Sequence, residues 1–147
     1  MHYHVSVDAI LLVDDRLIEN DVLQEILAES GYEVMAETEP RRVIPLVGSR
    51  SFDLVILDLS MAGQNGVELV HSLHRVQPSL PILIMTDSAT IENAVVALRE
   101  GAFDCLKKPF MKEEFLLAVD RVIRNSALAR ENVGLRERIQ REKNPQG

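Results

Sequence analysis

Five short apolar runs alternate along this chain with longer segments in which apolar residues recur at helical spacing. The runs that we expect to form strands are Ala9 to Val13, Glu33 to Ala36, Leu54 to Leu57, Pro81 to Met85 and Asp104 to Leu106. Several are apolar at almost every position, which is typical of parallel strands covered by helices on both faces. Five strand and helix units in succession predict an α/β fold with a doubly wound, five-stranded parallel sheet.

Glycine and proline mark the ends of the expected helices. Gly31 and Gly101 follow the first and the fourth helical segments, and we expect the second helix to begin at Pro40. The segment from Asn125 to Lys143 contains no proline and is rich in Arg, Glu and Leu. We therefore expect the fifth helix to continue through it as a C-terminal extension.

The length of the chain fits one domain with a helical appendage. At 147 residues, we expect residues 1–7 to form a tail, residues 8–125 the domain and residues 126–147 a helical linker. The chain has no apolar run near the roughly 18 residues that cross a bilayer, no signal-peptide pattern and one cysteine, Cys105. These features predict a cytoplasmic protein without membrane contact.

Charge and histidine content narrow the classes of partner. The formal net charge of −7 argues against direct nucleic-acid binding, because phosphates repel an acidic surface. His2 and His4 lie in the expected tail, and His71 and His74 are three residues apart on a helix without a further ligand. We interpret His2 and His4 as part of a disordered terminal tail and His71 and His74 as part of an exposed polar face, and none of the four as a metal ligand.

Polar residues follow four of the expected strands, where the carboxyl ends of parallel strands form a ligand-binding edge. They are Asp14, Asp15, Asp58, Thr86 and Lys108. Clustered carboxylates need a cation, and oxygen ligands without His or Cys favour Mg²⁺. Alone, each residue could be a helix cap, a strand-end hydroxyl or a solvated charge. Together they indicate phosphoryl chemistry, with Asp58 as the nucleophile and Thr86 and Lys108 holding phosphoryl oxygens.

The motifs around these residues resemble the receiver domains of response regulators, the CheY-like family, over about residues 8–125. The matching segments are Leu11 to Asp15, Leu54 to Met61 followed by Gly63 and Gly66, Pro81 to Thr86, and Gly101 to Asp104 leading to Lys108-Pro109-Phe110. The resemblance implies a flavodoxin-like sheet of strand order 2-1-3-4-5.

The resemblance also implies a role for each site residue. Asp58 would accept a phosphoryl group from a cognate histidine kinase. Asp15 and Asp58 would bind Mg²⁺ directly with the backbone carbonyl of Ser60, and Asp14 would act through water. The family catalyses its own phosphorylation and dephosphorylation, but its role is signalling and not enzymatic turnover.

Further implications concern the switch and the partners. Thr86 and Lys108 would contact the phosphoryl oxygens, and the Lys108-Pro109 bond is expected to be cis. Phosphorylation would then alter a homodimer formed through the face of the fourth helix, fifth strand and fifth helix, or through the C-terminal helix. The output expected from the family is control of transcription.

Three positions depart from the family pattern. Cys105 stands where an aromatic residue is usual, which leaves movement of the fourth helix as the expected response. Asp87 replaces a small residue, and this carboxylate could slow phosphorylation, strengthen metal binding or, as we expect, face solvent. Met61-Ala62-Gly63 replaces Met-Pro-Gly. A receiver-like docking or dimerisation module that is never phosphorylated is the alternative function.

The C-terminal extension carries a short heptad-like pattern. Leu128, Asn132, Leu135 and Ile139 have the alternating spacing of a two-stranded coiled coil. With the preceding domain, the segment resembles the linkers of NtrC-like and DctD-like transcription activators, so the chain is expected to be a regulatory fragment. A solvated linker without pairing is the alternative.

Overall fold

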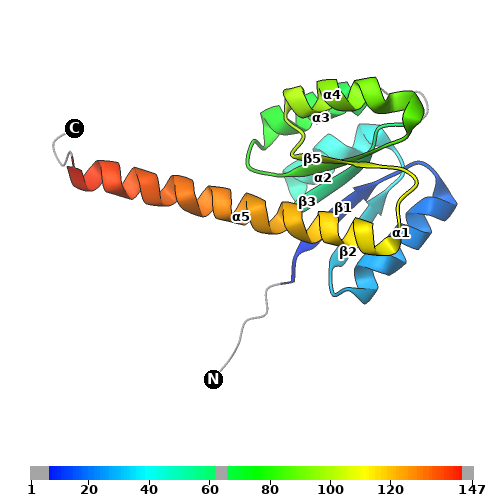
Figure 1. The fold of residues 1–147 in the computed structure, drawn as a ribbon, viewed down its shortest axis with the longest axis horizontal. Coiled ribbons are helices and arrows are strands. Elements are labelled where there is room, and N and C mark those ends of the chain that lie inside the picture. Colours follow the sequence, from blue (N-terminus) through cyan, green and yellow to red (C-terminus); the bar gives the residue numbers. More distant parts are fainter. Residues whose placement is uncertain (1–6, 62–65, 144–147) are drawn as a thin grey trace.

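The computed structural model describes residues 7–61 and 66–143, with side chains described up to residue 127. Strands and helices alternate along the chain, as Figure 1 shows. The elements are β1 (Ala9–Val13), α1 (Leu17–Glu29), β2 (Glu33–Glu37), the 3₁₀ turn η1 (Pro40–Arg42), α2 (Val43–Ser49), β3 (Leu54–Asp58), α3 (Gly66–Val76), β4 (Ile82–Thr86), the 3₁₀ turn η2 (Ser88–Thr90), α4 (Ile91–Glu100), β5 (Asp104–Lys107) and α5 (Lys112–Lys143).

The five strands form one parallel sheet in the order β2-β1-β3-β4-β5. This order confirms the predicted flavodoxin-like fold class. The ends of every strand agree with the sequence prediction to within one residue. The agreement reflects the strength of the signal, because fully apolar runs of this length are typical of buried parallel strands.

Helices cover both faces of the sheet (Figure 1). Alternate strand residues point to opposite faces, so Leu11 packs with α2, α3 and α4, whereas Ile10 packs with α1 and α5. Leu27 of α1 and Phe115 of α5 have no exposed surface in the second of these layers. Because both faces are covered, the loops at the carboxyl edge of the strands are the natural position for a functional site.

The second helix begins later than predicted. Pro40 begins a 3₁₀ turn, and the α-helix starts at Val43. Pro45 explains the difference, because it has no N–H to donate to the carbonyl of Arg41 in a helix that began at Pro40. With the start at Val43, Pro45 lies in the first turn, where an N–H needs no partner within the helix.

The first and fourth helices end at glycines, as predicted. Gly31 has a φ of 91° and Gly101 a φ of 127°, values that favour glycine. At Gly101 the backbone also runs close to a neighbour, because a Cβ there would lie 2.4 Å from the His74 ring. This close approach fixes the turn from α4 toward β5.

The last helix continues from the sheet layer to residue 143, and Figure 1 shows it extending well past the sheet. The predicted C-terminal extension is therefore confirmed as a helix. The side chains of Leu128, Asn132, Leu135 and Ile139 lie outside the described residues, as do His2, His4 and the Ala62-Gly63 segment. None of the described helices combines the length and the apolar character that a membrane span requires.

Candidate functional site

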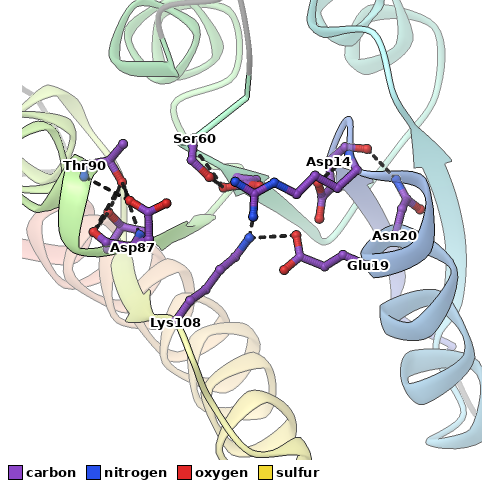
Figure 2. A network of polar contacts seen from close by, with 10 residues as sticks. Asp14, Glu19, Asn20, Ser60, Asp87, Thr90 and Lys108 are labelled. Carbon is purple, nitrogen blue, oxygen red and sulfur yellow. Dashed lines mark hydrogen bonds and ion pairs between the residues drawn. The ribbon is translucent and has the colours of Figure 1, made fainter.

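Asp14 after β1, Ser60 after β3 and Lys108 after β5 lie together at the carboxyl edge of the sheet (Figure 2), where Asp58 ends β3 and Thr86 ends β4. Asp14, Asp58 and Thr86 have no exposed surface, and the side chain of Lys108 is 10% exposed. A polar group at such depth is costly unless it is paired or binds a ligand. The contacts of each group therefore indicate what the site can do.

A single ammonium group links two acids across this edge. Nζ of Lys108 lies 3.1 Å from Oδ2 of Asp58 and 2.7 Å from Oε2 of Glu19. The pairs connect the loop after β5 to the end of β3 and to the first turn of α1. Burial lowers the pKa of Lys108, but the two carboxylates outweigh it and the pKa is raised. The lysine is thus held in its charged form.

The second oxygen of Asp58 is held by Ser60. Oδ1 of Asp58 accepts hydrogen bonds from the backbone N–H of Ser60 at 3.0 Å and from its hydroxyl at 2.7 Å. Burial raises the pKa of Asp58, but these bonds and the Lys108 charge outweigh it, so the pKa is lowered. Asp58 is therefore an ionised, oriented carboxylate, as a nucleophile must be.

The pKa of Asp14 is shifted in the opposite direction from that of Asp58. Its backbone carbonyl accepts a bond from Asn20 at 2.7 Å, and its Oδ1 accepts one from the N–H of Arg16 at 3.0 Å. Its Oδ2 is buried without a hydrogen-bond partner among the described residues. Burial, together with the adjacent Glu19 carboxyl, raises the pKa of Asp14 to about 8. Without a cation this carboxyl is therefore mainly protonated at neutral pH.

These acids fit a divalent metal ion. Oxygen atoms of Asp14, Glu19 and Asp58 all lie within 4.8 Å of one another. The unpartnered Oδ2 of Asp14 is a further sign, since buried polar atoms without partners are rare in proteins. Carboxylate oxygens without nitrogen or sulfur ligands favour Mg²⁺ over zinc or copper.

The acids that the structure brings together are not the same set that the sequence predicted. Glu19 joins Asp14 and Asp58, whereas Asp15 is half-buried and lies outside this three-acid cluster. Glu19 was not predicted, because an acid in the first turn of a helix is ordinarily explained by the helix dipole. Only its contact with Lys108, 89 positions away, reveals its place in the site.

Thr86 lies at the same edge but contacts the start of α4. Its hydroxyl oxygen is 2.5 Å from the hydroxyl oxygen of Thr90 and 3.2 Å from the carbonyl of Asp87. The buried hydroxyl of Thr86 thus connects the end of β4 to η2, the turn directly before α4. A switch that passes from Thr86 to α4 needs no aromatic residue at position 105.

Asp87 caps the short turn that follows β4. Its Oδ1 accepts hydrogen bonds from the N–H groups of Ala89 at 3.0 Å and Thr90 at 3.1 Å, and Thr90 completes a capping box. The expectation that this carboxylate simply faces solvent is therefore wrong. A cap satisfies free N–H groups of the turn and holds the residue beside the site.

The other singled-out residues have structural roles. Cys105 is half-buried beside the core layer under α2, α3 and α4, and burial raises the pKa of its thiol. His71 pairs with Glu100 of α4 at 2.8 Å on the surface. The Lys108-Pro109 bond is cis, as expected from the resemblance.

A pocket of about 720 Å³ opens beside the acidic cluster. Its polar wall includes Arg16, Glu19 and Lys108, and its apolar wall includes Val22 of α1 and Phe110 of the loop after β5. Lys108 therefore contacts the buried carboxylate of Asp58 and also lines an accessible opening.

Comparisons with known proteins agree with this geometry. The family model of the response regulator receiver domain matches residues 10–120, and the chain belongs to this family. The chain is 39% identical over 106 residues to the transcriptional regulatory protein ZraR of Escherichia coli O157:H7, across 72% of this chain and 24% of that protein. It is 32% identical over 122 residues to the transcriptional regulator NtrC of Azospirillum brasilense, across 83% of this chain and 25% of that protein. The chain thus spans about a quarter of the length of these relatives.

Solved structures give the same result. NtrX from Brucella abortus superposes with a TM-score of 0.84 at 31% identity, over 91% of this chain and 30% of that chain. A CheY-like receiver domain protein from Methanospirillum hungatei JF-1 superposes with a TM-score of 0.79 at 26% identity, over 84% of this chain and 99% of that chain. The predicted membership of the receiver family, and the similarity to NtrC-like regulators, are confirmed.

Proposed function

We propose that this receiver domain accepts a phosphoryl group on Asp58 from a histidine kinase, in a reaction that requires Mg²⁺. The observation that carries the proposal is the position of the Lys108 ammonium, 3.1 Å from the buried Asp58 carboxylate, in a residue that also lines an open pocket. An ionised carboxylate beside a fixed positive charge is suited to receive a phosphoryl group.

In the proposed transfer, an Asp58 oxygen attacks phosphorus as the bond from phosphorus to the donor histidine nitrogen breaks. The released imidazole keeps the bonding electron pair and takes a proton from water. Ser60 holds Oδ1 of the attacking carboxylate through two hydrogen bonds. Lys108 stabilises the negative charge of the transferred oxygens.

Mg²⁺ would be held by Asp14, Asp15 and Asp58 with the backbone carbonyl of Ser60, and Glu19 lies close enough to take part. When bound, the metal supplies positive charge to the phosphoryl oxygens. The residues of the chain provide the remainder: they orient the nucleophile, neutralise part of the charge and exclude water from one side. The protein would catalyse its own phosphorylation and dephosphorylation, in the service of signalling.

The response to phosphorylation would pass through Thr86. In the present state its hydroxyl bonds to Thr90, the residue before α4. A phosphoryl oxygen that captured the Thr86 hydroxyl would break this bond and leave α4 free to repack. A receiver needs two such arrangements of different stability, because a ligand shifts only a pre-existing equilibrium.

The proposed output is a change in dimerisation that controls transcription. Apolar side chains remain exposed on α4, among them Val95 and Leu98, and Phe103 just before β5 is exposed as well. We propose residues 8–125 as the receiver, residues 1–7 as a tail and residues 126–147 as a linker whose helix pairs with a second copy. The net charge of −7 argues against direct nucleic-acid binding by this chain, and we propose a cytoplasmic location.

The direct test is incubation with Mg²⁺ and acetyl phosphate, followed by intact mass measurement. We expect one added phosphoryl group on the protein and none on the Asp58→Asn variant. Asp21→Asn is the matched control, because Asp21 is an exposed acid on α1. Absence of labelling in the wild type, or equal labelling of Asp58→Asn, would favour the alternative of a docking module that is never phosphorylated.

Light scattering tests the proposed dimer. The mass is measured with and without beryllium fluoride, a phosphoryl mimic, in the presence of Mg²⁺. A monomer in both states would contradict dimerisation, whereas a change in mass would show which state pairs.

A further inference from the structure

Glu19 contacts Lys108 at the site, but the proposed phosphoryl transfer gives Glu19 no role. The side chain of Glu19 is 28% exposed, and its carboxylate approaches the Lys108 ammonium to 2.7 Å, against 3.1 Å for Asp58. The group that must stabilise a transferred phosphoryl group is therefore already paired with a second acid.

The two contacts of Lys108 compete with each other. An ammonium group has three N–H donors, and carboxylates of Glu19 and Asp58 accept from two of them. Phosphorylation moves the negative charge near Asp58 outward onto the phosphoryl oxygens. To follow this charge the ammonium must weaken its contact with Glu19, which holds it toward α1.

Glu19 also opposes the approach of the donor. Its carboxylate is one of the residues that line the pocket beside Lys108, and an acyl phosphate or phosphohistidine is itself negative. In this partly solvated position the repulsion is screened but not abolished. Both effects act in the same direction, against phosphorylation.

We propose that Glu19 is a positioning residue that slows phosphorylation of Asp58 by holding the Lys108 ammonium in an ion pair across the pocket. This inference rests on the proposed function and adds a residue that sets its rate. The reacting bonds are unchanged. With acetyl phosphate, the phosphorus–oxygen bond to the acetyl group breaks as the bond to an Asp58 oxygen forms, and acetate leaves with the electron pair.

The test compares initial rates of phosphorylation by acetyl phosphate, measured by intact mass at saturating Mg²⁺. Mg²⁺ saturation is established separately for each variant, because Glu19 also lies among the clustered acids. Relative to wild type, Glu19→Gln should be faster by about twofold to fivefold, the range for removing one partly solvated charge contact. Glu25→Gln, an exposed acid on the same helix, makes the same change in net charge and should leave the rate unchanged.

Two further variants separate positioning of the lysine from a general effect of charge. Glu19→Asp keeps the charge but shortens the side chain by one methylene, so it should be faster than the wild type if the ion pair with Lys108 matters, and slower than Glu19→Gln because repulsion of the donor remains. In a Lys108→Ala background the acceleration by Glu19→Gln should shrink, because no ammonium remains to be released and only the repulsion of the donor is relieved. The full acceleration in that background, or wild-type behaviour of Glu19→Asp, would overturn the positioning role.

The result also separates this inference from the proposed function. If the wild type takes up no phosphoryl group, the proposed function fails and with it the role of Glu19. If the wild type is labelled on Asp58 but Glu19→Gln is no faster, only the inference about Glu19 is overturned.

Discussion

The Lys108 ammonium lies 3.1 Å from a carboxylate oxygen of Asp58, 50 positions earlier in the chain. The pair connects the loop after β5 to the end of β3, and Asp58 has no exposed surface. One positive charge is thus shared between Asp58 and Glu19, with Asp14 in contact range of both acids. The stability of the metal-free domain must depend on this balance of charges.

Removal of the Lys108 charge should destabilise the metal-free protein. Lys108→Met leaves Asp58 and Glu19 without their cation, and we expect a loss of roughly 2–3 kcal/mol in the free energy of unfolding, somewhat less than for a fully buried pair. Urea denaturation in the presence of a chelator measures the change. Lys112→Met is the control, since its pair with Glu29 is exposed and should contribute about 0.5 kcal/mol. Equal losses in both variants would show that the site charges are not coupled to folding.

The pKa of Asp14 predicts how stability depends on pH without metal. Its folded-state pKa of about 8 exceeds the ordinary value of 3.8, so the folded protein binds a proton that the unfolded chain has lost. Stability should fall as pH rises between these two values, with a limiting slope of about 1.4 kcal/mol per pH unit, and level off above the higher one.

Asp14→Asn should flatten this dependence, because the amide does not titrate. The measurement is chemical denaturation at a series of pH values in a chelator. The lowered pKa values of Asp58 and Glu19 act at more acidic pH, so they do not obscure the comparison. An unchanged slope in Asp14→Asn would assign the titration to another group.

Magnesium should reverse the destabilising effect of the acidic cluster. At a Mg²⁺ concentration of about 100 times its dissociation constant, the free energy of unfolding should rise by about 2.7 kcal/mol. At a fixed Mg²⁺ concentration the gain should increase with pH, because the metal requires Asp14 to be ionised. Thermal unfolding with and without Mg²⁺ measures the gain, and Asp14→Asn should show much less of it than Asp21→Asn.

The contact between Thr86 and Thr90 predicts a link from the site to α4. Thr90→Val removes the 2.5 Å contact at nearly constant volume, at a cost of about 1 kcal/mol. We expect the amide signals of α4 to shift toward their positions in the beryllium fluoride complex before any mimic is added. Nitrogen–proton correlation spectra test this, and signals that stay in place would exclude Thr90 from the switch.

Asp87 should matter more for the local fold than for the chemistry. Asp87→Ala removes the side-chain oxygen that accepts from Ala89 and Thr90, so we expect a loss of about 1 kcal/mol in stability. Ser88→Ala, at an exposed neighbouring position, should change stability by less than about 0.5 kcal/mol. Urea denaturation of both variants shows whether the loss of stability comes from the missing cap or from any substitution in this turn.

Local signals in the sequence were sufficient to predict the strands and the fold class, whereas the strand order followed from the family resemblance. The apolar runs at Leu54 to Leu57 and Ile82 to Met85 predict buried parallel strands wherever they lie. Errors arose where two local signals conflict, as in the segment from Pro40 to Pro45. There Pro40 is a good first residue for a helix, but Pro45 prevents the helix from beginning so early.

The site was predictable only in part. The sequence by itself predicted that Asp14, Asp15, Asp58, Thr86 and Lys108 would lie at one edge of the sheet, because parallel strands bring their carboxyl ends together. Of the predicted acids, Asp14 and Asp58 lie in the three-acid cluster and Asp15 lies outside it. Only the tertiary structure decided which acid Lys108 shares with Asp58, and that the Thr86 hydroxyl bonds to Thr90. The order of strands and helices along the chain predicts at which edge of the sheet each strand ends. The pairing of side chains depends on distances between different elements, and no local pattern encodes those distances.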